Sequence, residues 1–311
     1  MLNGGAVMPL SEYALDALRS DGDFVLYRGR HRAFPASGTP SVLALAPARE
    51  HPAPELLRTL EREYSLRAEL DAAWAVRPVL LTRNEGRTTL ILEDPGGEPL
   101  DRLLGKPIEL GQFLRIAVGL CAAVRQLHGR GLIHKDIKPA NVLVHPDTGQ
   151  IRLMGFGIAS RLPRERQAPA PPEVIAGTLP YMAPEQTGRM NRSIDSRSDL
   201  YGLGVTLYEM LTGSLPFTAS DPMELVHCHI ARQPVPPGER LEGIPGPLSA
   251  IIMKLLAKTA EERYQTAAGA ESDLRRCLAE WETRRHIDEF PLGEHDTPDR
   301  DRKSTRLNSS H

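Results

Sequence analysis

The first hundred residues carry their hydrophobic side chains in short runs that turn-forming residues separate. Four such runs occur at residues 24–27, 42–45, 79–82 and 88–92. Short apolar runs bounded by turn residues are typical of β-strands. Between the second and third runs, residues 56–70 place leucines and a tyrosine at helical spacing, which predicts one helix. We therefore expect a small β-sheet with a single helix in this part of the chain.

The pattern becomes helical beyond Pro95-Gly96-Gly97. Apolar residues then recur on one face of a predicted helix, and two glycines stop it: Phe113, Ile116, Ala117, Leu120, Val124 and Leu127, followed by Gly129 and Gly131. Further helices are predicted over residues 200–211, 222–230, 248–258 and 267–284. The fold class is therefore α+β, with a small β-rich N-terminal lobe at 12–94 and a larger helical C-terminal lobe at 95–285.

The composition excludes several classes of partner. With 311 residues and 41% hydrophobic content, the chain can bury a core of this size. Its 38 Lys and Arg residues nearly balance 40 Asp and Glu residues, so no net field attracts nucleic acid or an anionic membrane. Three scattered cysteines without a CxxC pair suit a reducing compartment, and no apolar run approaches the roughly 18 residues of a membrane span. We expect a cytoplasmic chain with no nucleic-acid partner and no membrane span.

Both ends of the chain depart from this pattern. Residues 1–11 are predicted to be an N-terminal extension, and the charges among the first twenty residues are unlike those of a signal peptide. Residues 286–300 are predicted to begin a linker to a downstream region. Residues 301–311 are polar and without periodicity, and they resemble a translated sequencing adapter. We expect the natural chain to continue differently beyond residue 300.

Two short segments carry the candidate chemistry. The first is His-Lys-Asp-Ile-Lys-Pro-Ala-Asn at residues 134–141, which we call the 134–141 loop. It offers a carboxylate at Asp136, a cation at Lys138 and an amide oxygen at Asn141. Phosphoryl transfer needs a carboxylate near the attacking hydroxyl, a cation near the phosphate and oxygen ligands for magnesium. The second segment is Gly-Phe-Gly at residues 155–157, and its first glycine has no side chain that could bind a metal.

The order of motifs resembles that of eukaryotic-type Ser/Thr protein kinase domains in bacteria, over about residues 12–285. Three further motifs of that family follow the 134–141 loop: Gly-Thr-Leu-Pro-Tyr-Met-Ala-Pro-Glu at 177–185, Ser-Asp-Leu-Tyr-Gly-Leu-Gly at 198–204 and Glu-Glu-Arg-Tyr at 261–264. The resemblance implies a bilobal protein-kinase-like fold. It also implies that the buried Arg263 holds Glu185 and that Asp199 anchors the backbone of the 134–141 loop.

The resemblance assigns roles to the loop residues as well. Asp136 would accept or orient the proton of the substrate hydroxyl, Lys138 would neutralise the phosphate, and Asn141 would bind magnesium and so contact the nucleotide. Gly155 stands where the family has its second magnesium ligand, an aspartate. The implied cofactors are ATP and Mg²⁺ if the protein is active, and none if it is not.

The N-terminal lobe departs further from the family pattern. The phosphate-binding glycine loop aligns with residues 19–26, where all three of its glycine positions hold other residues. The phosphate-binding lysine falls at Leu45 or Ala46, and residues 1–105 contain no lysine. Glu63 resembles the helix glutamate that pairs with that lysine. Because it has no lysine partner, we expect Glu63 to be an exposed helix charge.

The adenine-binding hinge of the family aligns with Leu92 and Glu93. In the segment Leu92-Glu93-Asp94-Pro95, the proline stands where a backbone N–H normally donates to adenine, and proline has no N–H. If each lost contact is worth roughly 1.5 to 3 kcal/mol, as hydrogen bonds to charged groups are, losing three weakens Mg-ATP binding by several powers of ten.

Three functions remain open. The first is a regulatory pseudokinase or impaired kinase that binds a partner. The second is an active Ser/Thr kinase with an atypical mode of nucleotide binding. The third is a small-molecule phosphotransferase, which the Ala-Pro-Glu segment and the helix that starts near Asp199 disfavour because they organise a platform for protein substrates.

The expected partners follow from these alternatives. They are a protein substrate or a regulatory partner domain. Residues 290–296 resemble the linker that follows kinase-like domains in large bacterial sensors. That resemblance implies a covalently linked downstream region containing an ATPase and a sensor histidine kinase.

Overall fold

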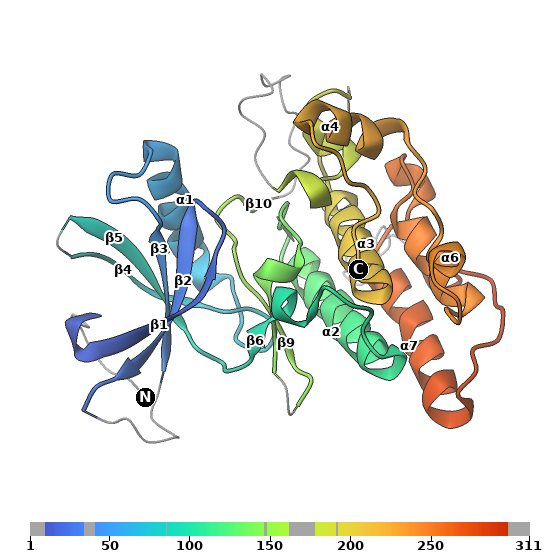
Figure 1. Cartoon of the computed structure of the whole chain (residues 1–311), viewed down its shortest axis with the longest axis horizontal. Coiled ribbons are helices and arrows are strands. Elements are labelled where there is room, and N and C mark those ends of the chain that lie inside the picture. Colours follow the sequence, from blue (N-terminus) through green and yellow to red (C-terminus); the bar gives the residue numbers. More distant parts are fainter. Residues whose placement is uncertain are drawn as a thin grey trace, which may run out of the picture. The chain divides into compact units, whose positions relative to one another are not determined.

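The chain divides into two compact units in the computed structural model (Figure 1). We call them the sheet unit, Met1–Gly97 with Met154–Ile158, and the helical unit, Glu98–Leu153 with Ala159–His311. The structure describes residues 10–33, 41–84, 86–145, 148–161, 178–190 and 192–297. The predicted adapter segment at 301–311 lies outside the described residues.

The sheet unit is built on five antiparallel strands in the order β1-β2-β3-β5-β4. A short 3-10 helix at Leu10–Glu12 precedes the first strand. The strands are β1 (Tyr13–Ser20), β2 (Phe24–His31), β3 (Val42–Pro47), β4 (Pro78–Asn84) and β5 (Arg87–Glu93). Helix α1 (Pro54–Ser65) follows β3 and continues into a 3-10 turn at Leu66–Ala68. The sheet and helix predicted from the hydrophobic runs are confirmed.

The two faces of this sheet bury different rows of side chains. On one face, Leu26, Leu45 and Leu90 are paired across β2, β3 and β5 and are at most 6% exposed. Directly paired residues project from the same face, and neighbours along a strand project from opposite faces. The other face carries a separate cluster that includes Ala44 and Ile91. Leu45 therefore points away from that cluster.

The helical unit contains the longer helices and two small sheets (Figure 1). Its helices are α2 (Leu110–Gly129), α3 (Ser196–Thr212), α4 (Pro222–Ala231), α5 (Pro237–Arg240), α6 (Gly246–Leu255) and α7 (Ala267–Arg284). Strands β6 (Glu98–Pro99), β8 (Val142–Val144) and β9 (Ile151–Leu153) form one sheet, and β7 (Leu132–Ile133) pairs with β10 (Ser160–Arg161). Short 3-10 helices span Leu100–Leu103, Pro139–Asn141, Leu179–Tyr181, Pro184–Thr187 and Ala260–Glu262.

Side-chain caps determine where several of these helices begin. Glu109, Asp221 and Thr266 each accept a hydrogen bond from a backbone N–H in the first turn of α2, α4 and α7. Asp195 does the same for α3, so that helix begins at Ser196 rather than at the predicted residue 200. The predicted helices are confirmed, with shifts of a few residues at their ends.

Helix α2 corrects one expectation about apolar length. By length and composition it is apolar enough to cross a membrane, although no run of that kind was expected. Within the described residues, 61% of its most apolar window is buried, and it packs along α7. Burial of this kind is typical of the core helix of a globular unit.

The segment that begins the predicted linker packs against α7. Asp296 accepts hydrogen bonds from the N–H groups of Gln265 at 2.6 Å and Thr266 at 2.9 Å. The guanidinium of Arg276 lies 4.2 Å from the ring centre of Phe290. The described part of this segment, through residue 297, is therefore anchored to the helical unit, because its polar and aromatic groups find partners there.

A buried ion pair joins two distant motifs of the helical unit. Arg263 is 1% exposed and donates to Glu185 twice, at 2.6 and 2.8 Å. Its other three N–H groups donate to the carbonyls of Ala257, Arg197 and Lys258. All five guanidinium donors are satisfied, which a buried arginine requires.

Replacing Arg263 with methionine should destabilise the chain strongly. The substitution leaves Glu185 buried without its cation, so the free energy of unfolding should fall by about 3 to 5 kcal/mol. Arg192→Ala is the matched control, because Arg192 pairs with Glu261 on the surface and such pairs contribute about 1 kcal/mol or less. Urea unfolding measures both. Equal losses would contradict a scaffold role for Arg263.

Candidate functional site

The 134–141 loop is held by a buried carboxylate on α3. Asp199 is 1% exposed and accepts hydrogen bonds from the backbone N–H groups of His134 at 2.9 Å and Lys135 at 2.7 Å. His128 Nε2 also lies 2.8 Å from the same carboxylate. Lys135 adopts a left-handed backbone with φ +71°, which these bonds hold in place. Asp199 thus contacts the backbone of the 134–141 loop, which is the position that the resemblance implied for it.

Asp136 is surrounded by donors from its own unit. Its Oδ2 lies 2.8 Å from Lys138 Nζ and accepts from Asn141 Nδ2 at 2.9 Å. Its Oδ1 accepts from the N–H of Thr178 at 3.1 Å. Burial alone would raise the pKa of Asp136, but the charge and hydrogen bond of Lys138, with help from His134 and Thr178, lower it below its usual value. The carboxylate is therefore ionised at neutral pH.

Thr178 completes this cluster and was not among the residues selected from the sequence. Its hydroxyl accepts a hydrogen bond from Lys138 Nζ, and its N–H donates to Asp136. Its place as the first hydroxyl of the 177–185 motif was the only signal available in the sequence. The structure brings the proposed proton acceptor, the cation and this hydroxyl together.

Asn141 offers one oxygen for a metal. Its Nδ2 donates to the carbonyl and the carboxylate of Asp136, both at 2.9 Å. Its side-chain oxygen makes no hydrogen bond within the part of the chain that the structure describes. This orientation suits an oxygen ligand for magnesium.

In the sheet unit, Glu63 is bound to the Gly-Phe-Gly segment. Glu63 is 1% exposed, which corrects the expectation of an exposed helix charge, and its Oε1 accepts from the N–H of Gly155 at 3.3 Å. Burial raises the pKa of Glu63 to about 7, while hydrogen bonds from Phe156 and Gly155 and the charge of Arg19 oppose that rise. Tertiary packing buries this group although residues 1–105 contain no lysine to pair with it.

Close packing against α1 explains the second glycine of this segment. A Cβ on Gly157 would lie 2.2 Å from Thr59 Cγ2 and 3.1 Å from the Thr59 carbonyl. Gly155 has φ +79°, a conformation that asparagine and aspartate tolerate better than most residues. Phe156 is fully buried, with its ring edge-on to Trp74 at 6.2 Å. The backbone of this segment thus packs against α1, at Glu63 for Gly155 and at Thr59 for Gly157.

The two candidate positions for the phosphate lysine lie on opposite faces of β3. Leu45 pairs with Leu90, and Leu43, on the same face, pairs with the fully buried Leu92. Ala46 projects to the other face. Leu45 therefore occupies the face of the hinge residue Leu92, and its side chain is apolar and 6% exposed.

The turn that replaces the glycine loop binds its own backbone. Asp21 Oδ1 accepts from the N–H groups of Asp23 at 3.2 Å and Phe24 at 2.8 Å. Gly22 supports the turn with φ +92°. In an anion-binding loop such N–H groups face the ligand. Here an internal carboxylate occupies them.

The hinge residues are likewise engaged within the sheet unit. Glu93 forms a double ion pair with Arg77, with contacts of 2.5 and 3.0 Å, and its N–H donates to the Arg77 carbonyl at 2.9 Å. Asp94 accepts from Ser41 at 2.6 Å and Arg28 at 2.8 Å. The carboxylates of both residues therefore have partners within the sheet unit.

The donor set does not fit magnesium in the arrangement of the resembled family. Asn141 supplies one oxygen, and Gly155 supplies no side chain at the second position. Within the described ranges, no group of three or more His, Cys, Asp or Glu residues could hold a metal ion. Magnesium prefers octahedral oxygen coordination, and the missing ligand leaves the family's arrangement incomplete.

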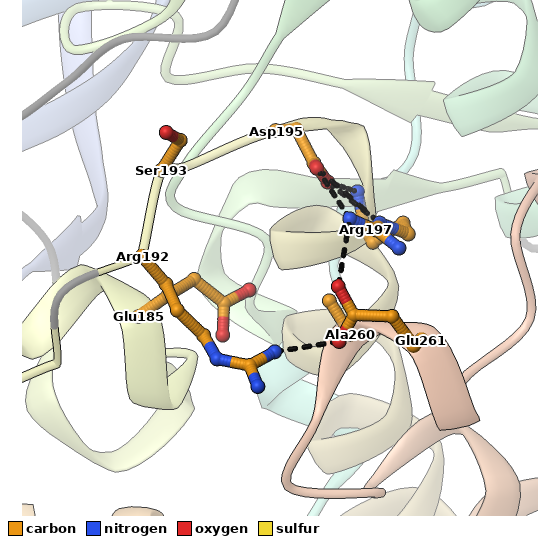
Figure 2. A pocket seen from close by; sticks show the side chains of 7 residues that line it. All are labelled: Glu185, Arg192, Ser193, Asp195, Arg197, Ala260 and Glu261. Atoms are coloured by element: carbon orange, nitrogen blue, oxygen red, sulfur yellow. Dashed lines mark hydrogen bonds and ion pairs between the residues drawn. The ribbon is translucent and has the colours of Figure 1, made fainter.

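A small pocket lies apart from the 134–141 loop, next to Glu185 (Figure 2). It has a volume of about 140 Å³ and is lined by Glu185, Arg192, Ser193, Asp195, Arg197, Ala260 and Glu261. Its cations are paired: Arg192 with Glu261 at 2.5 Å and Arg197 with Asp195 at 2.8 Å. Figure 2 shows that both arginines of the pocket have carboxylate partners on its wall.

The raised pKa of Glu63 predicts a pH-dependent stability. The folded state holds the Glu63 proton up to about pH 7, while the unfolded chain releases it near its ordinary pKa of 4.5. The free energy of unfolding should therefore fall by about 3 kcal/mol as the pH rises from 4.5 to 7. Glu63→Gln should abolish this decline in urea unfolding curves. Glu61→Gln, on the exposed side of α1, is the control, and a decline that survives in Glu63→Gln would contradict the assignment.

Comparison with known proteins identifies the family. The family model described as "Protein kinase domain" matches residues 45–273. The serine/threonine-protein kinase PknB of Mycobacterium tuberculosis is 38% identical over 168 residues, which cover 54% of this chain and 26% of the relative. PknB of Mycobacterium leprae is 41% identical over the same length, and Pkn1 of Myxococcus xanthus is 35% identical over 197 residues, 62% of this chain and 28% of the relative.

The chain thus spans about a quarter of the length of these curated relatives. The family match confirms the α+β, bilobal kinase fold expected from the sequence, and the relatives confirm the resemblance to bacterial Ser/Thr kinases. Because the family model covers more than half of its residues, the chain belongs to the protein kinase domain family.

Proposed function

We propose that the chain is a regulatory kinase-like signalling domain in which phosphoryl transfer is lost or strongly impaired. The observation that carries this proposal is Gly155. The resemblance places a magnesium ligand there, the residue has no side chain, and its N–H donates to Glu63. Kinases depend on that ligand to neutralise the charge of the transferring phosphate.

The arrangement of the 134–141 loop supports binding of a protein Ser/Thr segment. Asp136 is ionised and can accept a proton from a hydroxyl, and Lys138 lies beside it. Thr178 belongs to the segment that leads to Glu185, which Arg263 holds. This order supports an active Ser/Thr kinase with an atypical nucleotide mode as the second candidate. It does not favour a small-molecule phosphotransferase.

The partners belong to the same proposal. A protein substrate or a regulatory partner domain would bind the helical unit, and ATP with Mg²⁺ would be needed if the domain is active. The relatives with printed Ser/Thr kinase names support this choice. The resemblance of residues 290–296 to linkers of large bacterial sensors supports a downstream region with an ATPase and a sensor histidine kinase.

A direct transfer assay tests the proposal. The chain is incubated with γ-labelled ATP, magnesium or manganese, and generic protein acceptors, in parallel with Asp136→Asn. We expect label transfer no higher than in Asp136→Asn, because the metal arrangement is incomplete. Transfer that Asp136→Asn abolishes would instead support the active-kinase candidate.

Restoring the missing ligand tests whether Gly155 limits the reaction. Gly155→Asp should raise label transfer to about 10- to 100-fold above the Asp136→Asn background, the effect of one charge-assisted interaction of roughly 1.5 to 3 kcal/mol. Gly155→Ala is the control, because it introduces strain at φ +79° without adding a ligand. If transfer by Gly155→Asp stays at the Asp136→Asn background, the missing ligand at position 155 is not what limits phosphoryl transfer.

A further inference from the structure

A β-bulge in β1 turns Arg19 toward the buried face of the sheet. Ala17 pairs with Tyr27, but the next residue of β2, Leu26, pairs with Arg19 rather than with Leu18. Leu18 is therefore the extra residue of a bulge, a feature that re-aims side chains. Without the bulge, Leu18 would project beside Leu26 and Arg19 would project from the opposite face.

Arg19 consequently ends an otherwise apolar row. It shares the face of Leu26, Leu45 and Leu90, and its side chain is only 11% exposed although it stands on an edge strand. Leu45 lies two strands away, about 10 Å across the sheet. Arg19 thus places a cation on the face where the resembled family carries its phosphate lysine.

The charge of this arginine acts on the pKa of Glu63. The charge of Arg19 lowers the pKa of the buried Glu63 carboxylate, against a larger rise that burial causes, and residues 1–105 contain no lysine. In the resembled family, the corresponding glutamate orients a phosphate-binding lysine. Here a charge that acts on this glutamate comes from an arginine on a different strand.

Part of the Arg19 guanidinium has no acceptor. Nη1 is buried and makes no hydrogen bond to any described residue. Nη2 lies 3.7 Å from Asp21 Oδ2, an ion-pair distance that is too long for a hydrogen bond. Buried donors in native proteins are rarely left unsatisfied, so the unpaired Nη1 is a donor that suits an acceptor oxygen of a ligand.

We propose that Arg19 is a relocated phosphate-binding residue that receives the polyphosphate of a nucleotide through Nη1 while Glu63 orients the guanidinium. This inference rests on the proposed function, in which the domain retains ligand binding without efficient transfer. An arginine presents paired donors that match phosphate oxygens. Binding through Arg19 does not require the magnesium ligand that Gly155 lacks. Asp21 opposes it, because its carboxylate lies beside the same guanidinium.

Titration calorimetry with ATP and with inorganic tripolyphosphate, both in excess EDTA, tests this role on the full chain. The unmodified chain should bind both, and Arg19→Leu should weaken binding by about 10- to 100-fold, as expected for a lost charge-assisted contact. Arg30→Leu is the matched control on β2, because Arg30 is exposed and its ion pair with Asp16 is loose, at 3.9 Å. Arg19→Lys should retain part of the affinity.

Two further variants keep the test decisive if Arg19→Leu unfolds. Asp21→Asn preserves the acceptor for the turn and removes the competing charge, so it should tighten binding. Leu45→Lys in the Arg19→Leu background should restore binding. Equal affinity in Arg19→Leu and the unmodified chain, or no tripolyphosphate binding at millimolar concentration, would overturn the inference. These binding results involve no transfer, so they are separate from Asp136-dependent labelling, which alone tests the proposed function.

Discussion

The buried carboxylate of Asp199 is the contact on which the candidate site depends. It stands in the first turn of α3 and binds the backbone of His134 and Lys135 and the ring of His128. A buried carboxylate is costly unless donors surround it, so these contacts fix the entry to the loop in one conformation. Asp136 follows directly, and its position relative to the rest of the helical unit is set by this anchor.

The two units treat their charged groups differently. In the described part of the helical unit, the buried pair of Glu185 and Arg263 belongs to the scaffold, and Lys138 meets Asp136 in the 134–141 loop. In the sheet unit, carboxylates bind groups of their own unit: Asp21 its own turn and Glu63 the backbone of residues 155 and 156. At these positions the resembled family binds nucleotide, whereas here the polar groups bind other groups of the sheet unit. Arg19 differs, because its buried Nη1 makes no hydrogen bond to any residue that the structure describes.

Much of the fold was predictable because hydrophobic periodicity reflects burial directly. The strands near residues 42–45 and 88–92 and the helix at 267–284 follow from apolar spacing and turn residues alone. The docking of residues 286–297 was not predictable, because Asp296 and Phe290 are ordinary in sequence and gain their roles only from partners on α7. The burial of helix α2 was likewise not predictable, because apolar length cannot distinguish a core helix from a membrane-spanning one.

For the candidate site, the sequence by itself determined which groups exist: a loop with Asp136, Lys138 and Asn141, a glycine at 155 and no lysine before residue 106. Motif order was enough for this because it records residue types at set spacings. Only the tertiary structure decided which groups meet. Thr178 reaches Asp136 across 42 positions, Glu63 is buried against the backbone of Gly155, and one extra residue in β1 turns Arg19 inward. These contacts depend on register and packing between distant segments, which local sequence patterns do not encode.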